Sequence, residues 1–239
     1  MSTFLSIIIP AHNEANRLPN TLEQVLHFLD AQSFTSEVIV VENGSSDNTL
    51  AIAQQFAEKH KRVRVLQSER GKGAAVKLGM LEARGEYRFM CDADLSMPVE
   101  EISKFIPPAL EGTDIAIASR EAKGAVRYNE PAYRHLGGRG INFLIQILIL
   151  PGLNDTQCGF KCFRADAAEK LFNMQTLSGW SFDIEVLYIA RKFGYHTDEI
   201  PIHWYHDAET KVRALPDAIH MFQDIFRIHA NAWRGAYKK

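Results

Sequence analysis

Two aspartates separated by a single residue, Asp92 and Asp94, directly follow a strand expected at residues 86–91. Carboxylates this close together at the end of a strand can share a divalent cation. A cation there would neutralise the charge that develops on a departing diphosphate. The same spacing also suits an acidic turn in which Asp94 caps the next helix. The pair therefore predicts either a metal site or a helix cap.

Three further polar clusters precede this pair. RGKG at residues 70–73 has glycines that let a backbone approach a phosphate, and its Lys72 supplies a mobile positive charge. ENGSSDNT at 42–49 offers Glu42 and Asp47, which suit a ribose hydroxyl or a base edge. PAHNE at 10–14 offers hydrogen-bonding groups near a helix start. Taken alone, RGKG favours a turn that opens a helix, and the other two clusters are also consistent with helix caps.

Strand and helix patterns alternate in a way that brings the clusters together. The helical periodicity includes a helix over about residues 99–110. A buried strand is expected at residues 4–10, and further strands at 37–41, 63–67, 86–91 and 114–119. Such alternation predicts an α/β fold with a mostly parallel sheet flanked by helices, in which ligands bind at the carboxyl ends of the strands. All four clusters follow strands and should meet at that edge.

The pattern changes after residue 119. Residues 120–139 hold two acidic residues against five basic ones, Arg120, Lys123, Arg127, Arg134 and Arg139. This run could meet an anion, or it is a solvated loop. Further along the chain we expect an apolar helix at 141–150, a polar turn entering a strand at 154–163, a helix at 182–191, a strand at 197–201 and an amphipathic helix from residue 215.

Composition restricts the class of protein. Of the 239 residues, 46% are hydrophobic and 23% are charged, as in ordinary globular proteins. A formal charge of -2 gives no general basic field for nucleic acid. Three cysteines without a CxxC pair favour a reducing compartment, and the N-terminus does not read as a signal peptide. We expect a cytoplasmic protein, either soluble or peripheral on the cytoplasmic face of a membrane, and leave oligomer formation open.

The four clusters, in this order and spacing, resemble those of family 2 glycosyltransferases, and more narrowly the dolichyl-phosphate glucosyltransferase and mannosyltransferase branch. The resemblance continues nearly to the end of the chain, through IASR at 117–120, DTQCGFK at 155–161, GWSFDIE at 179–185 and IPIHWYHDAETKV at 200–212. It implies a single GT-A type domain over residues 1–239. Residues 1–119 would bind a nucleotide-sugar, and residues 120–239 would bind the acceptor and end in an amphipathic helix.

The resemblance also implies roles for individual residues. Asp92 and Asp94 would hold Mg²⁺ or Mn²⁺, and the catalytic candidates are Asp94, Arg120 and Asp183. The phosphate of a polyprenyl or dolichyl acceptor would be gripped by Arg120, Arg134 and Lys211. The donor would be contacted by Pro10, Ala11, Glu14, Glu42, Lys72 and Asp92.

Two departures from the family pattern bear on the donor. Asn43 stands where the common DDGS motif has a second carboxylate. Ser96 stands where mannosyltransferase relatives often have a glutamine metal ligand. The second departure favours UDP and glucose over GDP and mannose, and the expected reaction is an inverting hexose transfer.

A phosphate acceptor makes its own chemical demands. Its second pKa of about 6 leaves it mostly dianionic at neutral pH, so no general base is required. Basic residues and a metal must instead offset its repulsion with the donor diphosphate. A lipid acceptor also calls for a membrane-facing surface, which could comprise residues 141–150, Trp204, Tyr205, Ile219, Phe222 and Phe226. Packing on the core or on a second copy explains these residues equally well.

Three alternatives remain open. A family 2 enzyme acting on a saccharide or another alcohol would need a base, for which the candidates are Asp183, Asp155 and Glu185. With a phosphate acceptor, Asp183 and Glu185 could instead orient Lys72 or a basic residue that binds the acceptor. A nonenzymatic nucleotide-binding or membrane-surface module would need no base. A nucleotidyltransferase fits less well, because its first loop is usually glycine-rich and here it is PAHNE.

Overall fold

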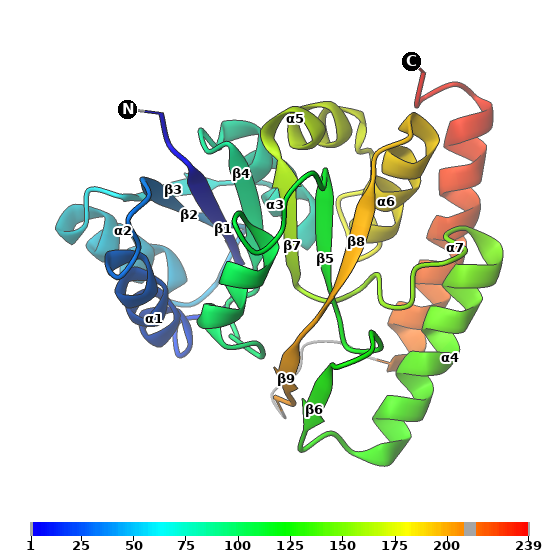
Figure 1. Ribbon diagram of the computed structural model, residues 1–239, viewed down its shortest axis with the longest axis horizontal. Helices are drawn as coiled ribbons and strands as arrows, with labels where there is room; N and C mark the ends of the chain where they lie inside the picture. The colour runs from blue at the N-terminus through cyan, green and yellow to red at the C-terminus, as the bar shows by residue number, and fades with distance from the viewer. Residues whose placement is uncertain (1, 208–213, 239) are drawn as a thin grey trace.

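The computed structural model describes residues 2–207 and 214–238, and it is built around a seven-stranded sheet (Figure 1). The strand order is β3-β2-β1-β4-β7-β5-β8. β7 pairs antiparallel with both of its neighbours, while the other six strands share one direction. The expected mostly parallel sheet is confirmed. The strands are β1 (Leu5–Ala11), β2 (Ser36–Glu42), β3 (Val63–Gln67), β4 (Tyr87–Cys91), β5 (Ile115–Ser119), β7 (Phe160–Arg164) and β8 (Thr197–Pro201).

Helices cover both faces of this sheet because the central strands are apolar on both sides. Along β1, Ile7 and Ile9 belong to one core and Ile8 to the other. The first core also takes in α1 (Leu18–Asp30), α2 (Thr49–Lys59) and the 3₁₀ helix η1 (Val99–Phe105). The second takes in α3 (Lys72–Glu82), α5 (Ala165–Met174) and α6 (Phe182–Phe193).

The helix expected over residues 99–110 is wrong in type and length. The structure has only a 3₁₀ helix that ends at Phe105, and Ile106 is extended. The prolines that follow at 107 and 108 give the reason, since the residue before a proline is disfavoured in the α conformation.

A second, two-stranded sheet pairs β6 (Val126–Tyr128) with β9 (His203–Tyr205). Between β6 and β7 lies α4 (Ala132–Leu148), which begins well before the expected apolar segment. It runs beside the C-terminal helix α7 (Ala214–Trp233), as Figure 1 shows. His229 Nε2 lies 3.1 Å from the carbonyl oxygen of Leu148 at this contact. Within the described ranges, no helix is long and apolar enough to cross a membrane.

Candidate active site

The carboxyl ends of β1, β2 and β4 place the expected donor-binding residues at one edge of the sheet. Pro10 and Ala11 close β1, and Ala11 pairs in register with Glu42 at the end of β2. All three are buried. Glu42 accepts hydrogen bonds from the backbone N–H of Ser45 and from Gln67 Nε2. The carboxylate of Glu42 therefore orders the loop that follows β2.

Asn43 connects this loop to the neighbouring segments. Its backbone N–H donates to the carbonyl of Ala11 at 3.1 Å, and its Nδ2 donates to the carbonyl of Gly71 at 3.4 Å. An aspartate at this position could not donate the second bond. Asn43, the residue that departs from the DDGS pattern, thus links the end of β2 to the RGKG turn.

The PAHNE loop is joined to the start of α2. Thr49 Oγ1 accepts a hydrogen bond from the backbone N–H of Glu14 at 2.8 Å. The Asp47 carboxylate accepts from the backbone N–H groups of Thr49 and Ala15, at 3.0 and 3.1 Å. These bonds favour a structural role for Asp47 over contact with a ribose. The Glu14 carboxylate lies 3.4 Å from Arg17 Nη1.

Lys72 and Asp92 form the central ion pair of the site. The ammonium of Lys72, the first residue of α3, lies 2.7 and 2.9 Å from the two oxygens of Asp92. Burial opposes its charge, but Asp92 and then Asp183 outweigh burial and raise the pKa of Lys72. Gly159 also lies against this carboxylate, since a Cβ added to it would lie only 1.9 Å from Oδ2. Asp92 is therefore held between a lysine and a glycine.

Asp94 is the more accessible of the two acidic residues. Its carboxylate accepts a hydrogen bond from the backbone N–H of Ser96 at 3.0 Å. Partial desolvation and the charge of Asp92 raise the pKa of Asp94. These two effects outweigh the opposing charge of Lys72. In the described part of the chain, no group of three or more His, Cys, Asp or Glu is placed to hold a metal. Two carboxylates suffice for a cation that also takes ligands from a substrate diphosphate, so the residues fit such an ion.

Asp183 lies in the interior, near the start of α6. It is 4% exposed, and its Oδ1 is 3.0 Å from Nζ of Lys161, which is itself buried in β7. Burial raises the pKa of Asp183 against the opposing effect of Lys161. Lys161 also donates a hydrogen bond to the carbonyl of Cys158. Asp183 thus faces a buried cation.

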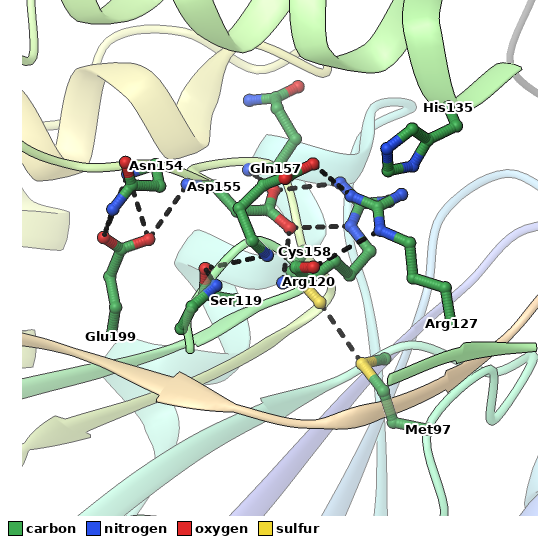
Figure 2. A network of polar contacts seen from close by, with 12 residues as sticks. Met97, Ser119, Arg120, Arg127, His135, Asn154, Asp155, Gln157, Cys158 and Glu199 are labelled. Carbon is green, nitrogen blue, oxygen red and sulfur yellow. Dashed lines mark hydrogen bonds and ion pairs between the residues drawn. The ribbon is translucent and has the colours of Figure 1, made fainter. Parts of the chain in front are cut away.

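Arg120, which follows β5, is locked to Asp155 (Figure 2). The fully buried carboxylate of Asp155 accepts from Nε at 2.6 Å, Nη2 at 2.9 Å and the backbone N–H of Arg120 at 3.0 Å. Glu199 accepts the backbone N–H of Asp155 at 2.9 Å and so fixes the loop. The guanidinium lies over the ring of Trp204, at 5.4 Å from its centroid. Asp155 is bonded through the Nε–Nη2 edge of the guanidinium, so Nη1 is not used in this pair.

The remainder of the basic run is partly neutralised internally. Arg127 lies 2.5 Å from a Glu121 oxygen and 2.7 Å from a Glu130 oxygen, whereas Lys123 and Arg139 are exposed. Arg134 belongs to α4, but its side chain is not described, and Lys211 lies outside the described residues. Of the three expected acceptor-binding residues, only the side chain of Arg120 can be placed.

Two contacts connect the Arg120 region to the acidic loop. Cys158 Sγ lies 3.3 Å from Met97 Sδ (Figure 2). The backbone N–H of Tyr205 donates to the carbonyl of Ser96 at 2.7 Å. The residues expected to bind donor and acceptor therefore lie on adjoining loops.

Sequence reasoning missed Gly159 and Lys161 as parts of this site. The available signal was a lysine inside the apolar strand FKCF, because a buried cation requires a partner. No sequence pattern indicated that Gly159 would touch Asp92. That contact follows from the pairing of Cys91 with Phe160 across β4 and β7.

The sequence matches a known family. The family profile described as Glycosyl transferase family 2 matches residues 6–172. The dolichyl-phosphate beta-glucosyltransferase of Drosophila melanogaster is 35% identical, across 98% of this chain and 77% of that protein. The human protein of the same name is 33% identical, and that of Saccharomyces cerevisiae 30% identical, with the same coverage.

Solved structures share the fold at lower identity. Mannosyl-3-phosphoglycerate synthase from Rubrobacter xylanophilus has a TM-score of 0.69 at 17% identity, covering 97% of this chain and 74% of its own. Glucosyl-3-phosphoglycerate synthase from Mycobacterium tuberculosis, solved with Mn²⁺, UDP and phosphoglyceric acid, has a TM-score of 0.67 at 16% identity, covering 95% and 77%. These likenesses confirm the expected GT-A type fold.

The Arg120–Asp155 pair should make stability depend on acid. Burial raises the pKa of Asp155, but Arg120 outweighs it and holds the pKa below the usual value of about 3.9. The ionised carboxylate therefore stabilises the fold above about pH 4, and this contribution is lost as the pH falls through the lower folded-state pKa. At pH 7, Asp155→Asn should lower the free energy of unfolding by up to about 3–5 kcal/mol, because a partly buried Arg120 loses its fully buried carboxylate partner.

Urea unfolding at several pH values checks this expectation. The difference in free energy of unfolding between wild type and Asp155→Asn should become smaller below about pH 4. Asp166→Asn, which removes the exposed partner of Arg164, is the control and should stay within about 1 kcal/mol of wild type. A difference for Asp155→Asn that does not vary with pH would contradict the assignment.

Proposed function

Because this chain belongs to glycosyltransferase family 2, we propose that it transfers glucose from UDP-glucose to the phosphate of a dolichyl or other polyprenyl lipid. The observation that carries the proposal is the position of Arg120. Its guanidinium is held by Asp155 on a loop beside the acidic loop of Asp92 and Asp94. A fixed arginine next to a donor site suits a phosphate acceptor. The relatives named dolichyl-phosphate beta-glucosyltransferases support the choice of sugar and lipid.

In the proposed donor complex, the diphosphate lies between the RGKG turn and the acidic loop. Lys72 supplies a positive charge beside Asp92, and the glycines of the turn admit the phosphates to the backbone. Asp92 and Asp94 would hold Mg²⁺ or Mn²⁺. When bound, the cation supplies positive charge for the leaving diphosphate.

The reaction then needs no proton transfer from the acceptor. An oxygen of the acceptor phosphate attacks the anomeric carbon, and the bond from that carbon to the diphosphate oxygen breaks with inversion. The nucleoside diphosphate leaves with the bonding electrons. Arg120 would orient the attacking phosphate through the edge of its guanidinium that Asp155 leaves unused.

The environment of Asp183 supports this acceptor over an alcohol. A general base must come within hydrogen-bond reach of the hydroxyl that it deprotonates. Asp183 is buried and lies beside Lys161. Asp155, another candidate base, is fully buried and bound to Arg120. Both carboxylates are better placed to hold cations than to accept a proton from a substrate.

We further propose that α4 and α7 face a membrane. Their outward faces carry large apolar side chains that the fold leaves exposed, namely Phe143, Leu144, Ile147, Ile219, Phe222, Phe226 and Trp233. Helices of this kind lie in the interfacial region of a bilayer. Trp204 packs beneath Arg120, but Tyr205 is exposed and stacks on Tyr128. Of the two aromatics, only Tyr205 remains a candidate for this surface.

A transfer assay tests the reaction directly. Purified protein with Mn²⁺ or Mg²⁺ is given UDP-glucose, GDP-mannose or UDP-N-acetylglucosamine, with and without a short polyprenyl phosphate. We expect glucose on the lipid phosphate only from UDP-glucose. Asp94→Ala should lower the transfer rate by at least about 100-fold, because the variant would lose a ligand of the cation whose positive charge stabilises the leaving diphosphate. Slow donor hydrolysis without lipid product would contradict the acceptor, and no binding of any donor would contradict the enzymatic proposal.

Gly159→Ala tests whether the position of Asp92 matters for transfer. The added methyl group would meet the Asp92 carboxylate and displace it from Lys72. A shift of about 1 Å can cost roughly 100-fold in rate, so the transfer rate should fall strongly while the circular dichroism spectrum is kept. Gly137→Ala, at a helical position with nothing within 4 Å of the new methyl group, should retain wild-type transfer. Full activity in Gly159→Ala would argue against this role for Asp92.

Vesicle sedimentation tests the membrane proposal. Replacing both Ile147 and Phe226 with serine removes two exposed apolar side chains from adjacent helices. The variant should bind phospholipid vesicles at least about tenfold more weakly, because each buried CH₂ group contributes roughly 0.8 kcal/mol. Its transfer to a short, water-soluble polyprenyl phosphate should be unchanged. Equal vesicle binding by the two proteins would rule out this surface.

A further inference from the structure

Glu185 is a fully buried carboxylate with no part in the proposed reaction. Its Oε2 accepts the backbone N–H groups of Thr176 and Leu177, at 2.9 and 2.7 Å. Its Oε1 accepts the hydroxyl groups of Thr176 and Tyr237, each at 2.5 Å. Glu185 in α6 therefore binds two separate segments, residues 175–180, here named the cover loop, and the C-terminal residues that follow α7.

The C-terminal segment reaches the cover loop at two points. Tyr237 is completely buried, and burial together with Glu185 raises the pKa of its hydroxyl, which stays protonated as a donor. Asn231, near the end of α7, donates from Nδ2 to Thr176 Oγ1 at 3.0 Å. Thr176 is thus bonded both to Glu185 and to α7.

The other side of the cover loop lies against the RGKG turn. The carbonyl of Ser178 accepts the backbone N–H of Ala74 at 3.2 Å. A Cβ on Gly71 would lie 2.3 Å from that same carbonyl oxygen. Gln175 Nε2 donates to the carbonyl of Gly73 at 2.9 Å. The turn and the cover loop are therefore in direct backbone contact.

We propose that Tyr237 and Asn231 are positioning residues for the donor site. They hold the cover loop through Glu185 and Thr176, and the cover loop holds the glycine turn and Lys72 in the geometry that receives the donor diphosphate. Trp180, at the end of the cover loop, lies 5.2 Å from the Lys72 ammonium and completes this contact. The inference rests on the proposed function. It adds that the C-terminal segment sets the affinity for the nucleotide.

The physical basis is the entropy of ordering. If the cover loop is less restrained, the glycine turn samples more conformations before the donor binds, and binding must then restrict them. The interactions formed with the nucleotide once it is bound are unchanged. Weakening the contacts that Tyr237 and Asn231 make with Glu185 and Thr176 should therefore raise the dissociation constant and the KM of the donor. It should leave kcat nearly constant.

Tyr237→Phe is the test, because it removes only the hydroxyl group. Calorimetry with UDP and Mn²⁺, well below the unfolding temperature, should show a dissociation constant about three- to tenfold above wild type, as expected for one hydrogen bond. KM for UDP-glucose should rise by a similar factor, with kcat within about twofold. Tyr188→Phe is the matched control, since that ring lies beside Tyr237 but its hydroxyl is not bonded to Glu185.

A second variant keeps the inference testable if Tyr237→Phe does not fold. Asn231→Ala removes the side-chain amide that bonds to Thr176 and contacts the Tyr237 hydroxyl, at a partly exposed position, and it should shift the dissociation constant in the same direction. If wild type binds UDP and the folded variants bind it equally well, the inference is overturned while the proposed function stands. If wild type binds neither UDP nor any other donor, the proposed function itself fails.

Discussion

The site depends on the position of the Asp92 carboxylate, which forms an ion pair with Lys72 and packs against Gly159. It requires the ends of three elements to meet: β4, α3 and the antiparallel strand β7. Parallel strands alone would bring β4 and α3 to the same edge. Gly159, directly before β7, leaves room for the carboxylate, and Lys161 within β7 has its charge held beside Asp183. One antiparallel strand, with the residue directly before it, thus supplies both the close approach and the second buried cation.

The sequence predicted the parts of the fold that depend on local periodicity. The first five strands and the polar clusters at their ends lie close to where the pattern places them, because alternating strand and helix periodicities are local properties of the sequence. β7 could not be placed in the same way, since its pairing of Cys91 with Phe160 joins residues far apart along the chain. The pairing of Val126 with His203 in the small sheet is long-range for the same reason. From the sequence, Asn43 could only be described as replacing a carboxylate of the DDGS motif. The structure shows that its amide donates a hydrogen bond to the Gly71 carbonyl.

The basic run at residues 120–139 likewise shows features that depend on contacts between distant residues and not on local sequence. Counting charges along residues 120–139 suggests a positive surface, but Arg127 lies between two glutamates. Arg120 is bonded to an aspartate 35 positions away. What remains at Arg120 is an oriented guanidinium edge, which can recognise a phosphate by geometry and adds little net charge. Orientation of this kind depends on the buried loop that contains Asp155 and Glu199, and no local pattern reveals it.

The charge balance of the described site explains why a cation belongs to the proposed reaction. Each described cation at its centre, Lys72, Lys161 and Arg120, lies against a carboxylate, and Asp94 adds a further negative charge. An anionic donor brought to such a site would meet repulsion at Asp94, at the point where its diphosphate must leave. A divalent ion held by Asp92 and Asp94 would supply the positive charge that offsets this repulsion. The acceptor phosphate then approaches a site whose charge the donor complex has already changed, so donor binding should precede acceptor binding.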